Sequence, residues 1–182
     1  AVVHGLVARN ETNLLATVAN TRYEGIVMNI DVMNTFFGHR EGIPLGITHD
    51  PKAFAAPQGS QKWTEYGRKH FPSVQRQNVE AEDAVEIYRR VLGAAANHSV
   101  TILSLGHFRN LENLLKSKPD KHSPLNGVEL ALSKVKEVVA MAGIYPNGSE
   151  WNIEMDTESA RYYIDNWPTK TTYLGFEIGN VT

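Results

Sequence analysis

Amide and carboxylate side chains are concentrated in one short segment, residues 147–156, which reads Asn-Gly-Ser-Glu-Trp-Asn-Ile-Glu-Met-Asp. The segment follows an apolar run, 138–141, whose composition is typical of a buried strand. Open α/β sheets place their ligands at the carboxyl ends of such strands. Glu150 and Asn152, and with them Asn147, are therefore candidate ligand-binding residues.

Strand and helix patterns alternate along the chain, and these elements would position the polar segment. Short apolar runs predict strands, and apolar residues at helical spacing predict helices. The predicted strands are 14–18, 43–47, 100–105, 137–142 and 171–176, and the predicted helices are 1–8, 25–37, 63–69, 78–95, 111–115, 125–133 and 156–163. The run 43–47 is expected at a sheet edge and 100–105 at a sheet centre. Asp156 is expected to cap the helix that follows it.

This alternation predicts an α/β fold with one mostly parallel, open sheet flanked by helices, joined by right-handed crossovers in a Rossmann-like arrangement. A length of 182 residues with 42% hydrophobic side chains predicts a single domain spanning 1–182. The net charge of −2, with scattered basic residues, argues against nucleic acid as a partner. No apolar run has the roughly 20 residues that span a bilayer, so no membrane partner is expected. Cysteine is absent, which excludes disulfides and thiol catalysis.

Three motifs carry a resemblance to a known family. Thr17-Val-Ala-Asn20 is similar to a strand-end motif whose Asn lines a ribose pocket, and 103–111, Leu-Ser-Leu-Gly-His-Phe-Arg-Asn-Leu, is similar to a Leu-Gly-Pro-Leu-Thr-Asn-Leu turn. The third motif joins 138–143 to Glu-Trp-Asn at 150–152 and Asp-Thr-Glu-Ser-Ala at 156–160. It resembles Val-Met-Gly-Gly, then Glu-Phe-Asn, then Asp-Pro-Glu-Ala-Ala. In order and spacing the chain resembles the inosine-uridine-preferring nucleoside hydrolases over nearly its whole length.

The resemblance implies hydrolysis of the N-glycosidic bond of a ribonucleoside. In that family a calcium ion holds the ribose hydroxyls and a water, and the ribosyl group passes through an oxocarbenium-like state. The resemblance assigns Asn20, Asn147, Glu150 and Asn152 to substrate binding and the main-chain carbonyl of Arg109 to calcium. A carbonyl ligand tolerates the change of side chain from Thr to Arg.

Other parts of the family pattern are missing. The Asp-rich segment that supplies most calcium ligands and the general base does not occur, and Ala1 falls where it would end. A later His or Asp would lie beyond Thr182. The chain is therefore expected to be the central part of the family's domain, with its catalytic base outside. Because calcium takes about 6 to 8 oxygen ligands, calcium and nucleoside are expected to bind only the complete form.

Each assignment has an alternative. Glu150 and Asn152 would otherwise belong to a polar loop that Trp151 anchors in the core, and Asn20 would form a turn or cap a helix. The chain as a whole could instead be a non-catalytic structural or carbohydrate-associated protein that retains the fold.

Asn-x-Ser/Thr sequons occur at Asn10, Asn97, Asn147 and Asn180, which suits a secreted protein, with a cytoplasmic protein as the alternative. A glycan on Asn147 would obstruct the pocket that this residue is predicted to line. A homo-oligomer, or a second chain that supplies the missing segments, is the further partner expected beside the ribonucleoside.

Overall fold

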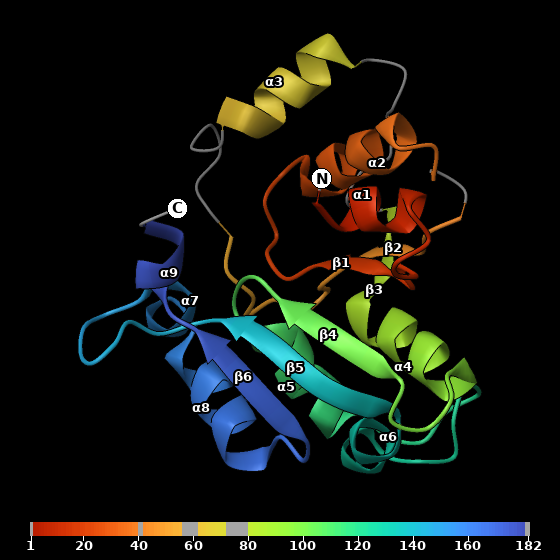
Figure 1. Ribbon diagram of the computed structural model, residues 1–182, viewed down its shortest axis with the longest axis vertical. Helices are drawn as coiled ribbons and strands as arrows, with labels where there is room; N and C mark the ends of the chain where they lie inside the picture. The colour runs from red at the N-terminus through yellow and green to blue at the C-terminus, as the bar shows by residue number, and fades with distance from the viewer. Residues whose placement is uncertain (1, 40–41, 56–61, 72–79, 181–182) are drawn as a thin grey trace. The chain divides into compact units, whose positions relative to one another are not determined.

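The computed structural model describes residues 2–39, 42–55, 62–71 and 80–180, except for the side chain of Arg68. The chain divides into two compact units, 1–87 and 88–182, and each is an α/β structure with an open, parallel, three-stranded sheet (Figure 1). The predicted α/β class with open parallel sheets flanked by helices is confirmed, and the arrangement is consistent with a Rossmann-like fold. The strands form two sheets, where the sequence predicted one.

The first unit contains three short parallel strands in the order β1-β2-β3. Its elements are α1 (Val2–Ala8), β1 (Thr17–Ala19), α2 (Ile26–Phe36), β2 (Leu45–Ile47), α3 (Lys62–His70), β3 (Glu82–Asp83) and the start of α4 (Ala84–Ala94). The strands align Thr17 with Leu45 and Gly46 with Glu82. A small apolar core forms between the sheet and α2, where Val27 packs with Leu45 and Ile47.

The second unit contains three longer parallel strands in the order β4-β5-β6. Its elements after α4 are β4 (Val100–Ser104), α5 (Arg109–Lys116), α6 (Gly127–Lys134), β5 (Val135–Met141), α7 (Trp151–Glu154), α8 (Thr157–Asn166), β6 (Lys170–Leu174) and α9 (Phe176–Asn180). The central strand β5 pairs with β4 on one side and β6 on the other. Both helical connections are the long crossovers that parallel strands require.

The core of the second unit lies between its sheet and the helices α5, α6 and α8. Alternate residues of β5, such as Val138 and Ala140, are fully buried, because successive side chains of a strand point to opposite faces. Phe108 stacks on Tyr163 of α8 with ring centroids 4.5 Å apart, and both side chains are fully buried. This core fixes the carboxyl end of β5, where the polar segment begins.

Several predicted elements hold and others need correction. The helices at 1–8 and 25–37 form as α1 and α2, and Asp156 caps α8 by accepting a hydrogen bond from the Ser159 main-chain N–H at 3.3 Å. The expected edge strand 43–47 is wrong, because β2 is the centre of its sheet. The expected central strand 100–105 is also wrong, because β4 lies at an edge of the described sheet.

The predicted helix 78–95 begins only at Ala84, since Glu82 and Asp83 pair with β2 as a strand. The start predicted at Asn78 lies outside the described residues. No helix of the described residues combines the length and the apolar composition needed to cross a bilayer.

Candidate functional site

The polar segment forms a compact corner at the carboxyl end of β5, which we call the β5 corner and define as Met141, Gly143, Glu150 and Asn152. Glu150 is 7% exposed. One carboxylate oxygen, Oε1, accepts the Asn152 main-chain N–H at 2.9 Å, and the other, Oε2, accepts the Gly143 N–H at 3.1 Å. Glu150 is thus the N-cap of α7 and also ties that helix to the end of the strand.

Gly143 has a positive φ of 84°, a conformation that glycine adopts without the cost that other residues incur. A Cβ at this position would lie 3.2 Å from the Tyr145 hydroxyl oxygen. This glycine turns the chain out of β5 and directs its N–H at Glu150. The loop then passes through a cis peptide bond between Tyr145 and Pro146 before it reaches α7.

Asn152 lies beside Glu150 and is half-buried. Its side-chain Nδ2 donates to the main-chain carbonyl of Met141 at 3.0 Å, which anchors α7 to the last residue of β5. Its main-chain carbonyl lies 3.3 Å from Nδ1 of His107, a buried residue that follows β4. No hydrogen bond of Asn152 Oδ1 occurs among the described contacts, so this oxygen can accept a hydrogen bond from a ligand.

The four predicted substrate-binding residues are not all brought together. Glu150 and Asn152 meet at the β5 corner, whereas Asn147 is exposed in the loop that precedes them. Asn20 is half-buried and directly follows β1 in the other unit. Trp151 is 55% exposed, so the alternative in which it anchors the loop in the core is wrong.

Arg109, predicted to offer its main-chain carbonyl to calcium, is the first residue of α5 and has a buried side chain. Its guanidinium makes a two-pronged ion pair with Asp156, in which Nε donates to Oδ2 at 2.8 Å and Nη2 donates to Oδ1. Nη1 donates to Glu112 Oε2 at 2.9 Å. Arg109 therefore joins the start of α5 to the cap of α8, and its charge is matched by two buried carboxylates.

The described residues around Arg109 do not fit a calcium site. In a regular helix the carbonyl of the first residue accepts an N–H from the next turn, and calcium needs about 6 to 8 oxygen ligands. The two carboxylates nearest to Arg109, Asp156 and Glu112, are held by its guanidinium. Among the side chains that the structure describes, no three His, Asp or Glu residues are grouped so that they could hold a metal ion.

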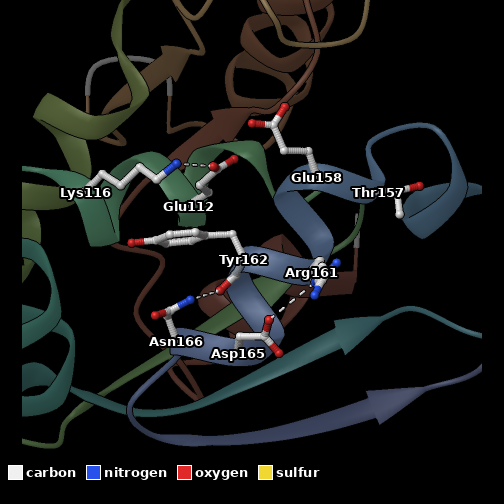
Figure 2. A pocket seen from close by; sticks show the side chains of 8 residues that line it. All are labelled: Glu112, Lys116, Thr157, Glu158, Arg161, Tyr162, Asp165 and Asn166. Carbon is white, nitrogen blue, oxygen red and sulfur yellow. Dashed lines mark hydrogen bonds and ion pairs between the residues drawn. The ribbon is translucent and has the colours of Figure 1, made fainter.

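A pocket of about 410 Å³ lies between α5 and α8 and contains none of the predicted site residues (Figure 2). Charged side chains dominate its lining, among them Glu112, Lys116, Glu158, Arg161 and Asp165. Lys116 Nζ donates to Glu112 Oε1 at 2.5 Å and lies 4.2 Å from the centre of the Tyr162 ring. The hydrogen bond to Glu112 raises the pKa of Lys116. Within this pocket Lys116 is thus paired with Glu112, and Arg161 with Asp165.

Sequence reasoning missed the ion group of Arg109, Glu112 and Asp156. The spacing of Arg109 and Glu112, three residues apart in one helix, is a recognisable pattern for a side-chain pair. The third member lies 47 residues from Arg109, and no local pattern indicates that the two meet. The burial of His107, which stands where the resembling turn has Pro, is likewise not indicated by any local pattern.

The described residues define an α/β protein with open parallel sheets and one polar corner at the end of a central strand. Comparison with known proteins adds no identification, because neither a family model nor a curated protein matches this chain.

Proposed function

We propose that this chain is the central part of a nucleoside-hydrolase-like protein that, in its complete form, cleaves the N-glycosidic bond of ribonucleosides. One observation carries the proposal: Glu150 and Asn152 lie together at the carboxyl end of the central parallel strand β5. Open α/β sheets bind ligands at this position. The same two residues belong to the motif by which the chain resembles the nucleoside hydrolases.

The chemistry of the β5 corner suits a ribosyl group. Each carboxylate oxygen of Glu150 accepts one main-chain N–H, and an ionised carboxylate offers about four lone-pair sites in all. The remaining sites, together with Asn152 Oδ1, can accept hydrogen bonds from sugar hydroxyls. When the bond from the anomeric carbon to the base breaks, positive charge develops on the sugar, and a nearby carboxylate stabilises it. Water then supplies a hydroxyl group to the anomeric carbon and a proton to the base.

Calcium is part of the proposal only for the complete form. The ion would orient the ribose hydroxyls and a water. The described residues supply no set of ligands for it, and we therefore route no step through Arg109. Glu150 and Asn152 hold the sugar in this proposal. Asn147, in the exposed loop that precedes the corner, and Asn20, in the other unit, are further substrate-binding candidates.

A second candidate function has its own support. Every side-chain hydrogen bond that the structure describes for Glu150 and Asn152 goes to the main chain or to Met141, which is how residues with a purely structural role would behave. This observation favours a non-catalytic structural or carbohydrate-associated protein that retains the fold. In that case the corner would hold α7 in place and bind no sugar.

Release of free base from inosine and uridine distinguishes the two functions. The natural protein, purified as it occurs, would be incubated with each nucleoside in calcium and in a calcium chelator, and base and ribose would be quantified by chromatography. We expect base and ribose in equal amounts, with release abolished by the chelator. Asn152→Ala should lower kcat/KM by about 10-fold or more, because it removes Oδ1 and the loss of one substrate hydrogen bond in the transition state costs about 1.5 kcal/mol.

The matched control is Asn113→Ala, because Asn113 is half-buried in α5 and is outside the β5 corner. It should leave kcat/KM within about twofold of the natural protein, a difference of less than about 0.5 kcal/mol. No base release under any condition, with a folded protein, would favour the structural alternative.

A further inference from the structure

The four sequons of this chain share a structural property that the proposed function does not use. We propose that Asn10, Asn97, Asn147 and Asn180 are acceptor sites for N-linked glycans. A glycan is bulky and hydrated, so a folded protein accommodates it only on an exposed asparagine. All four sequon asparagines are exposed.

The other asparagines provide the comparison. Of the described asparagines outside sequons, most are buried or half-buried: Asn20, Asn29, Asn34, Asn110, Asn113, Asn126 and Asn152. Only Asn13 and Asn166 are exposed. A chance distribution of sequons would place some on buried positions, such as Asn34, which is fully buried. The described chain instead keeps its sequons on the surface.

The atom that would carry the sugar is Nδ2 of the asparagine. None of the described hydrogen bonds uses Nδ2 of a sequon asparagine. Asn97 shows the point most clearly, since Ser133 Oγ at 3.2 Å and Lys134 Nζ at 2.9 Å both donate to its Oδ1. These contacts hold the side chain by its oxygen. By contrast, the exposed Asn166, which is not in a sequon, donates through Nδ2 to the Tyr162 carbonyl at 2.8 Å.

The positions of the four sequons relative to the helices and strands also suit glycosylation. Asn10 has a φ of 56° and ends the turn after α1, and Asn97 precedes His98, whose φ is 50°. Asn147 lies in the loop between β5 and α7, and Asn180 ends α9. Each site therefore lies at the end of an element or in a connection between two elements, and its side chain is exposed.

The modification is a transfer with a defined donor, an oligosaccharide joined through a diphosphate to a lipid. Asparagine Nδ2 forms a bond to the anomeric carbon of the sugar, and the bond from that carbon to the diphosphate oxygen breaks. The lipid diphosphate leaves, and the amide loses one proton. The donor and its transferase belong to the secretory pathway, so the proposal also predicts that this protein passes through it.

A glycan on Asn147 changes the interpretation of the β5 corner. Asn147 is three residues from Glu150, and a glycan on its Nδ2 would obstruct the approach of a ribose to this amide. Glu150 and Asn152 would then bind the sugar without Asn147. Asn147 was predicted to line the ribose pocket and is also a sequon, and of these two roles the proposal favours the glycan acceptor.

The test is mass mapping of the natural protein after enzymatic removal of N-linked glycans in heavy-oxygen water. The enzyme converts each glycosylated Asn to Asp and incorporates one heavy oxygen. We expect this label at Asn10, Asn97, Asn147 and Asn180, and a decrease in the intact mass. In a secretory host, Asn97→Gln and Asn147→Gln should each remove one glycan, whereas the control Asn13→Gln should remove none.

Unlabelled asparagine at one of the four positions overturns the assignment of that position, and unlabelled asparagine at all four overturns the proposal. Equal labelling at Asn13 or Asn166 would also overturn it, because it would show deamidation without a glycan. The measurement needs no enzymatic activity, so its result is independent of whether the protein hydrolyses nucleosides.

Discussion

Replacement of Glu150 by Gln should destabilise the protein by about 2 kcal/mol. The carboxylate accepts two main-chain N–H groups, from Gly143 at 3.1 Å and from Asn152 at 2.9 Å, and the residue is 7% exposed. Glutamine has one acceptor oxygen and places an amide N–H₂ where the other oxygen was. One main-chain donor therefore loses its partner, and a hydrogen bond to a charged group contributes about 1.5 to 3 kcal/mol.

The effect is measured by urea unfolding of Glu150→Gln beside the natural sequence. With a urea dependence of about 1 to 3 kcal/mol per molar, a loss of 2 kcal/mol lowers the midpoint by roughly 1 M. The matched control is Glu154→Gln, because Glu154 belongs to the same short helix, is exposed and makes no described side-chain contact. The control should change the free energy of unfolding by less than about 0.5 kcal/mol.

Equal stability of the two variants would refute this reasoning. It would mean that the Glu150 carboxylate does not hold the turn after β5, and the geometry of the β5 corner would lose its physical basis. Glu150→Ala should be the most destabilised variant, since it removes both hydrogen bonds and the cap of α7. The order of stability Glu154→Gln, Glu150→Gln, Glu150→Ala is the expected result.

Two further predictions concern charged groups of the second unit. Arg109→Met should destabilise the protein by about 3 to 5 kcal/mol, measured by urea unfolding, because the buried Asp156 loses its ion-pair partner and the buried Glu112 keeps only Lys116. Adding Asp156→Asn should recover much of the loss, and no recovery would contradict the assignment. The hydrogen bond from Arg89 lowers the pKa of Asp120 from 3.8 to about 2, so its contribution to stability is present above pH 3.8 and is lost as the pH falls toward 2. Asp120→Asn should flatten the pH dependence of the unfolding midpoint in that interval, and an unchanged profile would contradict the ion pair.

The sequence predicts the element types well where local chemistry determines them. The helix predicted at 25–37 ends near its expected end. Gly38 follows it with a φ of 78°, and a glycine in this left-handed conformation commonly terminates a helix. Asp156 was predicted as a cap because a carboxylate can accept the free N–H groups of a first helical turn. Both features depend on neighbours within a few residues.

The order of the strands depends on distant neighbours and could not be predicted. Residues 43–47 contain Pro and Gly, which weaken a strand pattern, yet β2 is central. Gly46 is needed there, since a Cβ would lie 2.6 Å from Ile87 Cδ1 and 3.0 Å from the Glu82 carbonyl oxygen. The run 100–105 has the apolar composition of a central strand, but its Leu103 is 50% exposed.

In the candidate site, too, the features set by neighbouring residues could be predicted and the contacts between distant residues could not. The sequence predicted that Glu150 and Asn152 would follow a buried strand, and the structure places them at its carboxyl end. It could not show that Glu150 binds the N–H of Gly143, seven residues earlier, because this contact requires the turn at Gly143. Nor could it show that Arg109 pairs with Asp156, 47 residues away.

The central claim of the proposed function is that the β5 corner binds the ribose of a nucleoside. The most direct measurement is a nuclear magnetic resonance titration of the isotope-labelled natural protein with inosine in the presence of calcium. We predict that the main-chain N–H signals of Gly143 and Asn152 and the side-chain amide of Asn152 shift first and saturate together. Unchanged signals at these three groups would contradict the account, whether or not inosine shifts the signals of another part of the protein.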